Sequence, residues 1–257
     1  MSNNSDYSFV PFNELIELLK NNQVNQFQIS YKDSLGNELS DSLSTLLNQG
    51  KLYREFYRDK NQQITQIRVK HLEEKNIFKE IQIRELFSNP FNQVNIVDIN
   101  CNKIDSIIMD AFEKDQNVRK GIDVGIQNVD EVNQTNVISL IEKCGWPEKE
   151  ELIRSIWYVI QHADSGLMTY YYPKFKELVA KGLLKESTMA LMEDRMLMNN
   201  GFPQIYGSQI VQQNVYKFRD PININKRRAK VGLAPIEEYA TRFGFEFKLE
   251  DYIDQTK

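Results

Sequence analysis

Residues 155–164 read SIWYVIQHAD, and this stretch indicates most directly what the second half of the chain folds into. Its apolar side chains recur at helical spacing, so a helix over residues 148–164 would bury one broad apolar face. The stretch also holds His162, one of only two histidines in 257 residues. It therefore predicts a helical core and gives a place to look for a functional site.

The end of this helix leaves two alternatives open for Asp164. If the helix continues to residue 164, the Asp164 carboxylate falls on the buried face, where an unpartnered charge would cost on the order of several kcal/mol. His162 would then lie at the border of that face. If the helix ends earlier, Asp164 opens an Asp-Ser-Gly turn and accepts hydrogen bonds from the backbone.

Amphipathic segments continue on both sides of this stretch. Apolar spacing predicts helices over residues 102–120 and 133–144, and Gly145-Trp146-Pro147 ends the second of them. Residues 170–182 and 187–201 predict two more helices, which we expect to form an antiparallel pair. From about residue 98 onward, the chain is therefore predicted to be mainly α-helical.

Residues 1–90 follow a different pattern, with more strand-like segments than helical ones. Residues 10–20 predict a short amphipathic helix, and alternating apolar residues predict strands over 26–33, 51–59, 62–72 and 79–86. Asp59-Lys60-Asn61 would join the two middle strands as a hairpin.

The boundary between the two patterns is predicted at residues 88–93, SNPFNQ, because Asn89-Pro90 disfavours a helix there. The predicted fold class is α+β: a small N-terminal α+β unit over residues 1–90, then a mainly α-helical domain over residues 98–257.

Composition restricts the classes of function. A formal charge of −4 and a sequence pI near 5.5 argue against a protein that coats nucleic acid, which depends on neutralising phosphates. No apolar run reaches the roughly 18 to 20 residues of a membrane span, and the N-terminus lacks a signal-peptide layout. We therefore expect a cytoplasmic protein with neither a nucleic-acid nor a membrane partner.

The cysteines and histidines give no metal motif. Cys101 and Cys144 are predicted to be free, since disulfides are rare in a reducing compartment. His71, the second histidine, ends a predicted strand and is expected near the surface. No zinc-ligand spacing or cofactor-binding motif is present, so neither a metal nor a cofactor is expected.

A cluster of charges interrupts the helix predicted over residues 187–201. Glu193, Asp194 and Arg195 are consecutive on a helix that is otherwise apolar on nearly every side. Because consecutive helical positions point in different directions, the three cannot all pair with one another. Either Arg195 joins a structural ion-pair network with neighbouring acids, or one of the two acids faces His162 and orients its imidazole as a general base requires.

Polar side chains also gather after Gly201. The loop FPQIYGSQ, residues 202–209, carries Gln204, Tyr206 and Gln209, which either form a self-satisfied turn or contact a ligand. Further on, Arg228 of the Arg227-Arg228 pair is a candidate for binding a carboxylate or phosphate, although paired arginines at a helix start are more often surface ion-pair partners.

The order and spacing of these motifs resemble those of a known family. The motifs are Gly145-Trp146-Pro147, Gln161-His162-Ala163-Asp164, Glu193-Asp194-Arg195, Gln204-x-Tyr206-Gly207-x-Gln209, and Arg227-Arg228-x-x-x-Gly232-Leu233-x-Pro235 with Tyr239. Over residues 98–243 they resemble a bacterial family catalogued as domain of unknown function 6624. The family usually has threonine where this chain has Ser208, a change that keeps the hydroxyl. The resemblance implies a shared architecture and a shared polar set, with no reaction attached.

Together these observations predict a polar pocket in the helical domain. His162 would be the catalytic base, with Asp194 or Glu193 orienting it. The residues predicted to bind substrate are Arg195, Gln204, Tyr206, Gln209, Arg228 and Asp164. Such a site fits a hydrolase or transferase acting on a small polar molecule or peptide. The alternative is a non-enzymatic module, such as an immunity or regulatory protein, that captures a protein partner and uses the polar set as an internal network.

Overall fold

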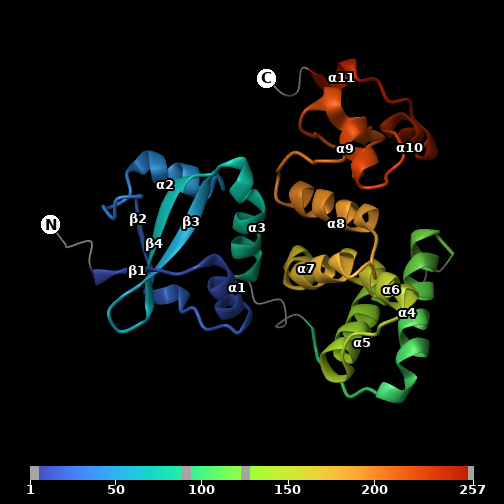
Figure 1. Cartoon of the computed structure of the whole chain (residues 1–257), viewed down its shortest axis with the longest axis horizontal. Helices are drawn as coiled ribbons and strands as arrows, with labels where there is room; N and C mark the ends of the chain where they lie inside the picture. The colour runs from blue at the N-terminus through green and yellow to red at the C-terminus, as the bar shows by residue number, and fades with distance from the viewer. Residues whose placement is uncertain (1–5, 88–93, 123–127, 254–257) are drawn as a thin grey trace. The chain divides into compact units, whose positions relative to one another are not determined.

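The fold class is α+β, as predicted (Figure 1). The computed structural model describes residues 6–87, 94–122 and 128–253. The contacts within the chain divide it into two compact units, residues 1–89 and 90–257. The predicted boundary at residues 88–93 lies outside the described residues.

A four-stranded sheet forms the centre of the first unit. The strands are β1 (Ser8–Phe9), β2 (Ser30–Lys32), β3 (Leu52–Arg58) and β4 (Ile64–His71), in the order β1-β3-β4-β2. β3 and β4 form the predicted antiparallel hairpin, β1 lies antiparallel to β3, and β2 lies parallel to β4. Asp59 fixes the hairpin turn, since its Oδ1 accepts hydrogen bonds from the backbone N–H groups of Asn61 (2.8 Å) and Gln63 (3.0 Å).

Helices α1 (Phe12–Lys20), α2 (Asp41–Asn48) and α3 (Ile77–Leu86) accompany the sheet. The helix predicted over residues 10–20 is confirmed as α1, which buries Leu15, Ile16 and Leu19. α3 packs against both α1 and β3, and it adds Ile81 and Ile83 to the core. The first unit thus has its own hydrophobic core.

Two strand predictions in this unit are wrong. Residues 79–86 belong to helix α3, where Ile81 and Ile83 are both buried. The alternation over this short run resembled a strand, but lysine, glutamate, glutamine, arginine and leucine all favour a helix. The strand predicted over 26–33 is shortened to β2, because residues 26–28 form a 3₁₀ turn that begins at Asn25.

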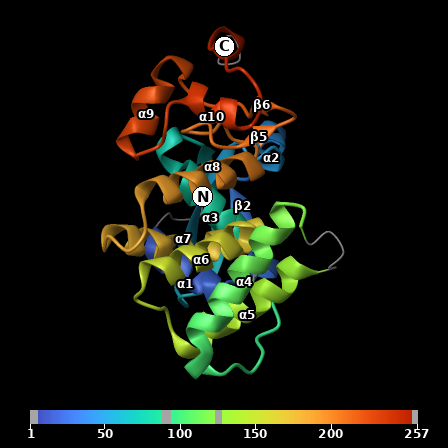
Figure 2. The same cartoon turned by 90° about the vertical axis from the view of Figure 1, so that its right-hand side faces the viewer.

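The second unit is mainly helical, as predicted. Its longer helices are α4 (Ile104–Arg119), α5 (Val129–Cys144), α6 (Glu150–Gln161), α7 (Ser165–Ala180) and α8 (Glu186–Asn199). The shorter elements are β5 (Ile210–Val211), β6 (Asn214–Val215), α9 (Ile224–Lys230), α10 (Ile236–Arg242) and α11 (Glu250–Ile253). α4 packs against α5 and α6, α6 against α7, and α7 against α8 (Figure 2). In the described part of the chain, no helix is long and apolar enough to cross a bilayer.

The helix predicted over residues 148–164 is α6, and it ends before His162 and Asp164. α6 buries Ile153, Ile156 and Trp157 and ends at Gln161, which leaves His162 in the C-cap position. Asp164 is exposed and is the N-cap of α7, where its Oδ1 accepts a hydrogen bond from the backbone N–H of Leu167 at 3.0 Å. The turn alternative for Asp164 is confirmed. The prediction that Asp164 binds substrate finds no support, since its carboxylate caps a helix.

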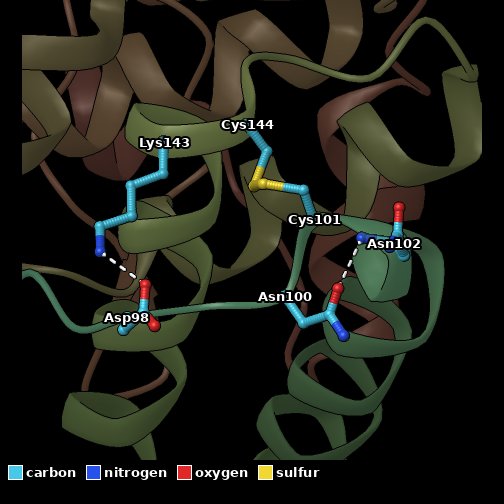
Figure 3. The surroundings of a disulfide bond; sticks show 6 residues. All are labelled: Asp98, Asn100, Cys101, Asn102, Lys143 and Cys144. Carbon is cyan, nitrogen blue, oxygen red and sulfur yellow. Dashed lines mark hydrogen bonds and ion pairs between the residues drawn. A yellow bond between two sulfur atoms is a disulfide. The ribbon is translucent and has the colours of Figure 1, made fainter.

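The prediction of free cysteines is wrong. Cys101 and Cys144 form a disulfide with a Cα–Cα distance of 5.5 Å (Figure 3). Cys101 lies in the 3₁₀ turn that leads into α4, and Cys144 is the last residue of α5. Because α4 and α5 pack together, these two residues meet although they are 43 positions apart in the sequence. Spacing alone did not reveal this proximity.

Removing the disulfide should destabilise the second unit. The Cys101→Ser/Cys144→Ser double variant is expected to lose about 2–4 kcal/mol in free energy of unfolding, because the bond restricts the unfolded chain across a long loop. Urea unfolding of the oxidised wild type and the double variant measures the difference. The reduced wild type should unfold near the double variant. Equal midpoints for the oxidised wild type and the double variant would contradict the prediction.

Candidate functional site

The functional candidate at the end of α6 is a pair formed by His162 and Asp115. His162 Nδ1 lies 2.7 Å from Asp115 Oδ1, which comes from α4. The Asp115 side chain is 2% exposed and the His162 side chain 13% exposed, so the pair is anchored in the protein but open to solvent at the imidazole. This is an imidazole oriented by a carboxylate, the arrangement predicted for a general base, with a different acid.

Asp115 was not among the predicted site residues, although the sequence carried a signal for it. Ile108, Ala111 and Asp115 are the buried residues of α4, and they follow one another at helical spacing. A carboxylate that continues an apolar stripe needs a partner. Only the packing of α4 against α6 shows that this partner is His162.

The other nitrogen of the imidazole is placed to accept a proton. Gln161 Nε2 lies 3.4 Å from His162 Nε2. The Gln161 amide NH₂ can donate to His162 Nε2 only when that imidazole nitrogen carries no proton. The neutral tautomer that satisfies both contacts has its proton on Nδ1, donated to Asp115, and an unprotonated Nε2 whose lone pair accepts from Gln161. That is the tautomer that a base acting through Nε2 requires.

Two arginines lie near this pair. Arg119 Nη2 is 3.6 Å from Asp115 Oδ1, and the same nitrogen also bonds both carboxylate oxygens of Asp130, at 2.8 and 2.7 Å. Arg195 comes from α8, and its Nη1 donates to the backbone carbonyl of Gln161, the residue before His162, at 3.3 Å. We call His162, Asp115, Gln161, Arg119 and Arg195 the histidine site.

Arg195 is the most unusual charge in this site. Its Nε is buried and has no hydrogen-bond partner, and within the described ranges no carboxylate lies within 4.0 Å of its guanidinium. Burial, and next the charge of Arg119, lower the pKa of Arg195. A partly buried cation with an unused donor is costly unless something satisfies it. The arrangement therefore places a cation that has no carboxylate partner in the described residues beside a candidate base.

Asp194 has a different role from the one predicted. Asp194 is fully buried, with 0% exposure. Its carboxylate accepts hydrogen bonds from the backbone N–H groups of Ile205 (2.7 Å), Tyr206 (3.0 Å) and Ser208 (2.8 Å). Burial raises the pKa of Asp194, and these hydrogen bonds oppose the rise. The prediction that Asp194 orients His162 is wrong, because the carboxylate is used to anchor the loop over residues 202–209.

The two glutamines of that loop also bond within the protein. Gln204 Oε1 accepts from the backbone N–H of Gln209 at 2.6 Å, and Gln204 Nε2 donates to the carbonyls of Gln209 (3.1 Å) and Tyr216 (2.8 Å). Gln209 Nε2 donates to the hydroxyl of Ser208 at 3.1 Å. These amides form the self-satisfied turn that was the alternative to ligand contact.

Arg228 is buried at 1% exposure and likewise holds backbone. Its Nε donates to the carbonyl of Ala234 at 2.6 Å, its Nη1 donates to the carbonyl of Tyr206 at 2.7 Å, and its guanidinium lies 4.7 Å from the centre of the Tyr239 ring. The structure therefore supports neither a substrate-binding nor a surface ion-pair role for Arg228.

Glu193 bonds to helix α7 and not to the histidine site. It accepts a hydrogen bond from the hydroxyl of Tyr172 at 2.8 Å, and it contributes to raising the pKa of Tyr206 to about 12, after burial of that ring. The prediction that Glu193 orients His162 is therefore wrong too. Successive residues differ by about 100° around a helix, so at most one of the three could face the pair, and that residue is Arg195.

Glu193 makes stability depend on pH. Burial raises its folded-state pKa above the unfolded value of 4.5, so its contribution to stability is fully present below pH 4.5 and is lost as pH rises through the folded-state pKa. We expect Glu193→Gln to melt like the wild type near pH 4 and at a higher temperature near pH 8. Thermal melts at both values test this, with exposed Glu186→Gln as the matched control. A difference independent of pH would contradict it.

No metal centre emerges from these side chains. Within residues 6–87, 94–122 and 128–253, no group of three or more His, Cys, Asp or Glu could hold a metal ion.

Comparison with known proteins identifies the family of the second unit. The chain matches no curated protein and no solved structure. Residues 104–250, more than half of the chain, match a model described as a family of unknown function, DUF6624. The matched range contains the helices of the histidine site and the loop that Asp194 anchors, and it confirms the resemblance seen in the sequence. The chain therefore belongs to the family of unknown function DUF6624.

Proposed function

We propose that the histidine site is an active site for hydrolysis or group transfer on a small polar molecule or peptide that carries an anionic group. The observation that carries this proposal is the 2.7 Å contact between His162 and Asp115 beside Arg195, a cation without a carboxylate partner in the described residues. A base and an anion-binding group within one site are the two parts that such a reaction needs.

Each residue has a distinct part in the proposed reaction. His162 Nε2 takes the proton of a water or hydroxyl nucleophile as its oxygen attacks an electrophilic carbonyl or phosphoryl centre. Asp115 keeps Nδ1 protonated and stabilises the imidazolium that forms. The imidazolium then returns the proton to the leaving group as its bond to that centre breaks. Arg195 would hold an anionic oxygen of the substrate through its planar guanidinium.

A screen of the full chain against chromogenic carboxylic esters, phosphate esters and aminoacyl amides tests the proposal. We expect turnover in at least one class, and turnover lowered by about 100-fold or more in a folded His162→Gln variant. His71→Gln is the matched control, because it removes the other histidine of the chain from the first unit. Turnover in His162→Gln equal to that of the wild type would exclude His162 as the base, and no turnover in any class would count against an enzyme of this kind.

A second candidate is a module that binds another protein, as an immunity or regulatory protein does. A binding module of this kind would use its polar side chains as an internal hydrogen-bond network. Asp194, Gln204 and Gln209 do bond within the protein, which favours this candidate. A co-purified partner whose binding is unaffected by His162→Gln and Arg195→Gln would support this candidate. A partner lost with either variant would place binding at the histidine site instead.

We also propose an oxidising compartment in place of the cytoplasm. The disulfide between Cys101 and Cys144 supports this, since such bonds persist where thiols are not kept reduced. Mass spectrometry of protein trapped with a thiol-blocking reagent in its native cells tests the proposal. Two blocked thiols would contradict it.

A further inference from the structure

The first unit has a cavity of its own, far in the sequence from the histidine site. It has a volume of about 540 Å³, which falls within the range of small-molecule sites. It lies where the end of α2, strands β2 and β3 and helix α3 meet. Its lining residues are Tyr31, Leu47, Asn48, Gln49, Gly50, Arg54, Glu80 and Arg84. The formal charges of this lining are two positive and one negative.

Glu80 holds Arg54 in position within this cavity. Glu80 Oε1 accepts from Arg54 Nε at 2.9 Å, and Glu80 Oε2 accepts from the Arg54 backbone N–H at 3.1 Å. The two side chains are 3% and 12% exposed. Of these two bonds only the one from Nε involves the guanidinium, and the described residues offer no hydrogen-bond partner to its two Nη nitrogens. The outer edge of a fixed guanidinium is the part that binds carboxylate and phosphate oxygens in pairs.

The second guanidinium is held by a glycine. Arg84 Nη2 donates to the backbone carbonyl of Gly50 at 3.3 Å. A Cβ added at Gly50 would lie 2.6 Å from that nitrogen, and Gly50 also has a φ of +68°, a conformation that side chains rarely adopt. Only glycine therefore lets Arg84 lie in this place. Each of these two arginines is thus held by a hydrogen bond before any ligand arrives, which lowers the entropic cost of binding.

We propose that the first unit binds a small molecule carrying a carboxylate or phosphate group in this cavity, through Arg54 and Arg84. Glu80 positions Arg54 and pairs with its charge, so that Arg54 is not a buried, unpaired cation when no ligand is bound. Tyr31 and Leu47 supply an apolar wall, so the ligand has an apolar part beside its anionic group. This site differs from the histidine site in its unit and in its residues.

Titration of the ¹⁵N-labelled full chain with phenyl phosphate, benzoate and inorganic phosphate tests the proposal. The expected result is saturable shifts of the Gly50 backbone amide and the Arg54 and Arg84 side-chain signals, with phenyl phosphate or benzoate binding more tightly than inorganic phosphate. Arg54→Lys, which keeps the charge but loses the planar fork, should weaken binding at least tenfold. Arg195→Gln, in the histidine site, should leave these shifts unchanged.

Two variants protect the test from a folding artefact. Arg54→Gln/Glu80→Gln removes both charges together, so neither remains buried and unpaired, and it should abolish the shifts while the sheet signals persist. Arg58→Lys on the same strand is the matched control, because Arg58 pairs with Glu14 outside the cavity lining. No saturable shift with any of the three probes, or equal affinity in the wild type and Arg54→Lys, would overturn the proposal.

Discussion

Replacing His162 by glutamine is expected to lower turnover by about 100- to 10,000-fold, the usual contribution of a general base. The amide can fill part of the imidazole's place but cannot take a proton at neutral pH. Asp115→Asn should cause a loss of up to about 10,000-fold, because an asparagine amide can donate to Nδ1 and so favour the wrong tautomer. The kcat of each variant, measured with the best substrate class from the screen, gives both values.

The pattern across variants distinguishes catalysis from folding. Because Asp115 is buried, each variant needs a thermal melt beside its kcat. Arg195→Gln should raise KM more for substrates with an anionic group than for neutral ones of the same class, while His162→Gln lowers kcat for both. A variant of His162 or Asp115 whose loss of turnover follows only the unfolded fraction would show that the pair is structural.

A large loss of stability is expected for Asp194→Asn, about 1–3 kcal/mol in free energy of unfolding for each buried backbone N–H that loses its acceptor. The carboxylate accepts three backbone N–H groups at 2.7–3.0 Å in a site with no exposure. An asparagine offers one acceptor oxygen, and its NH₂ group would face the remaining donors. For a unit of this size the melting temperature should fall by roughly 2–4 °C for each kcal/mol.

Asp164→Asn is the matched control for this prediction. Asp164 also accepts a backbone N–H, but it is exposed, and asparagine is as good as aspartate at a helix N-cap. This control should change stability by no more than about 0.5 kcal/mol. Equal stability of Asp194→Asn and Asp164→Asn, measured by urea unfolding, would contradict the anchoring role of Asp194.

The sequence predicted the helices of the second unit because their apolar residues recur with one period over many turns. The region of α3 was wrongly predicted as a strand because Ile81 and Ile83 are two residues apart, which is the spacing of a strand. The other apolar residues of this short segment did not give a clear helical spacing. The disulfide could not be predicted from Cys101 and Cys144, since their proximity depends on how α4 and α5 pack.

The candidate site was predicted in part. The sequence singled out His162 and Arg195, and the structure brings both to one site through Gln161. The sequence also singled out Glu193 or Asp194 as the partner of His162. In the structure the partner is Asp115, which lies on α4. A sequence shows that a buried charge needs a partner, but which charge meets it depends on packing between helices.

The tautomer of His162 tests the central claim most directly. In a long-range ¹H–¹⁵N spectrum of the ¹⁵N-labelled His71→Gln variant, only His162 contributes imidazole signals. At a pH where the ring is neutral, we expect its proton on Nδ1, donated to Asp115, and an unprotonated Nε2; in the Asp115→Asn background this preference should disappear. A proton on Nε2, or a tautomer that Asp115→Asn leaves unchanged, would contradict the assignment of His162 as a base oriented by Asp115.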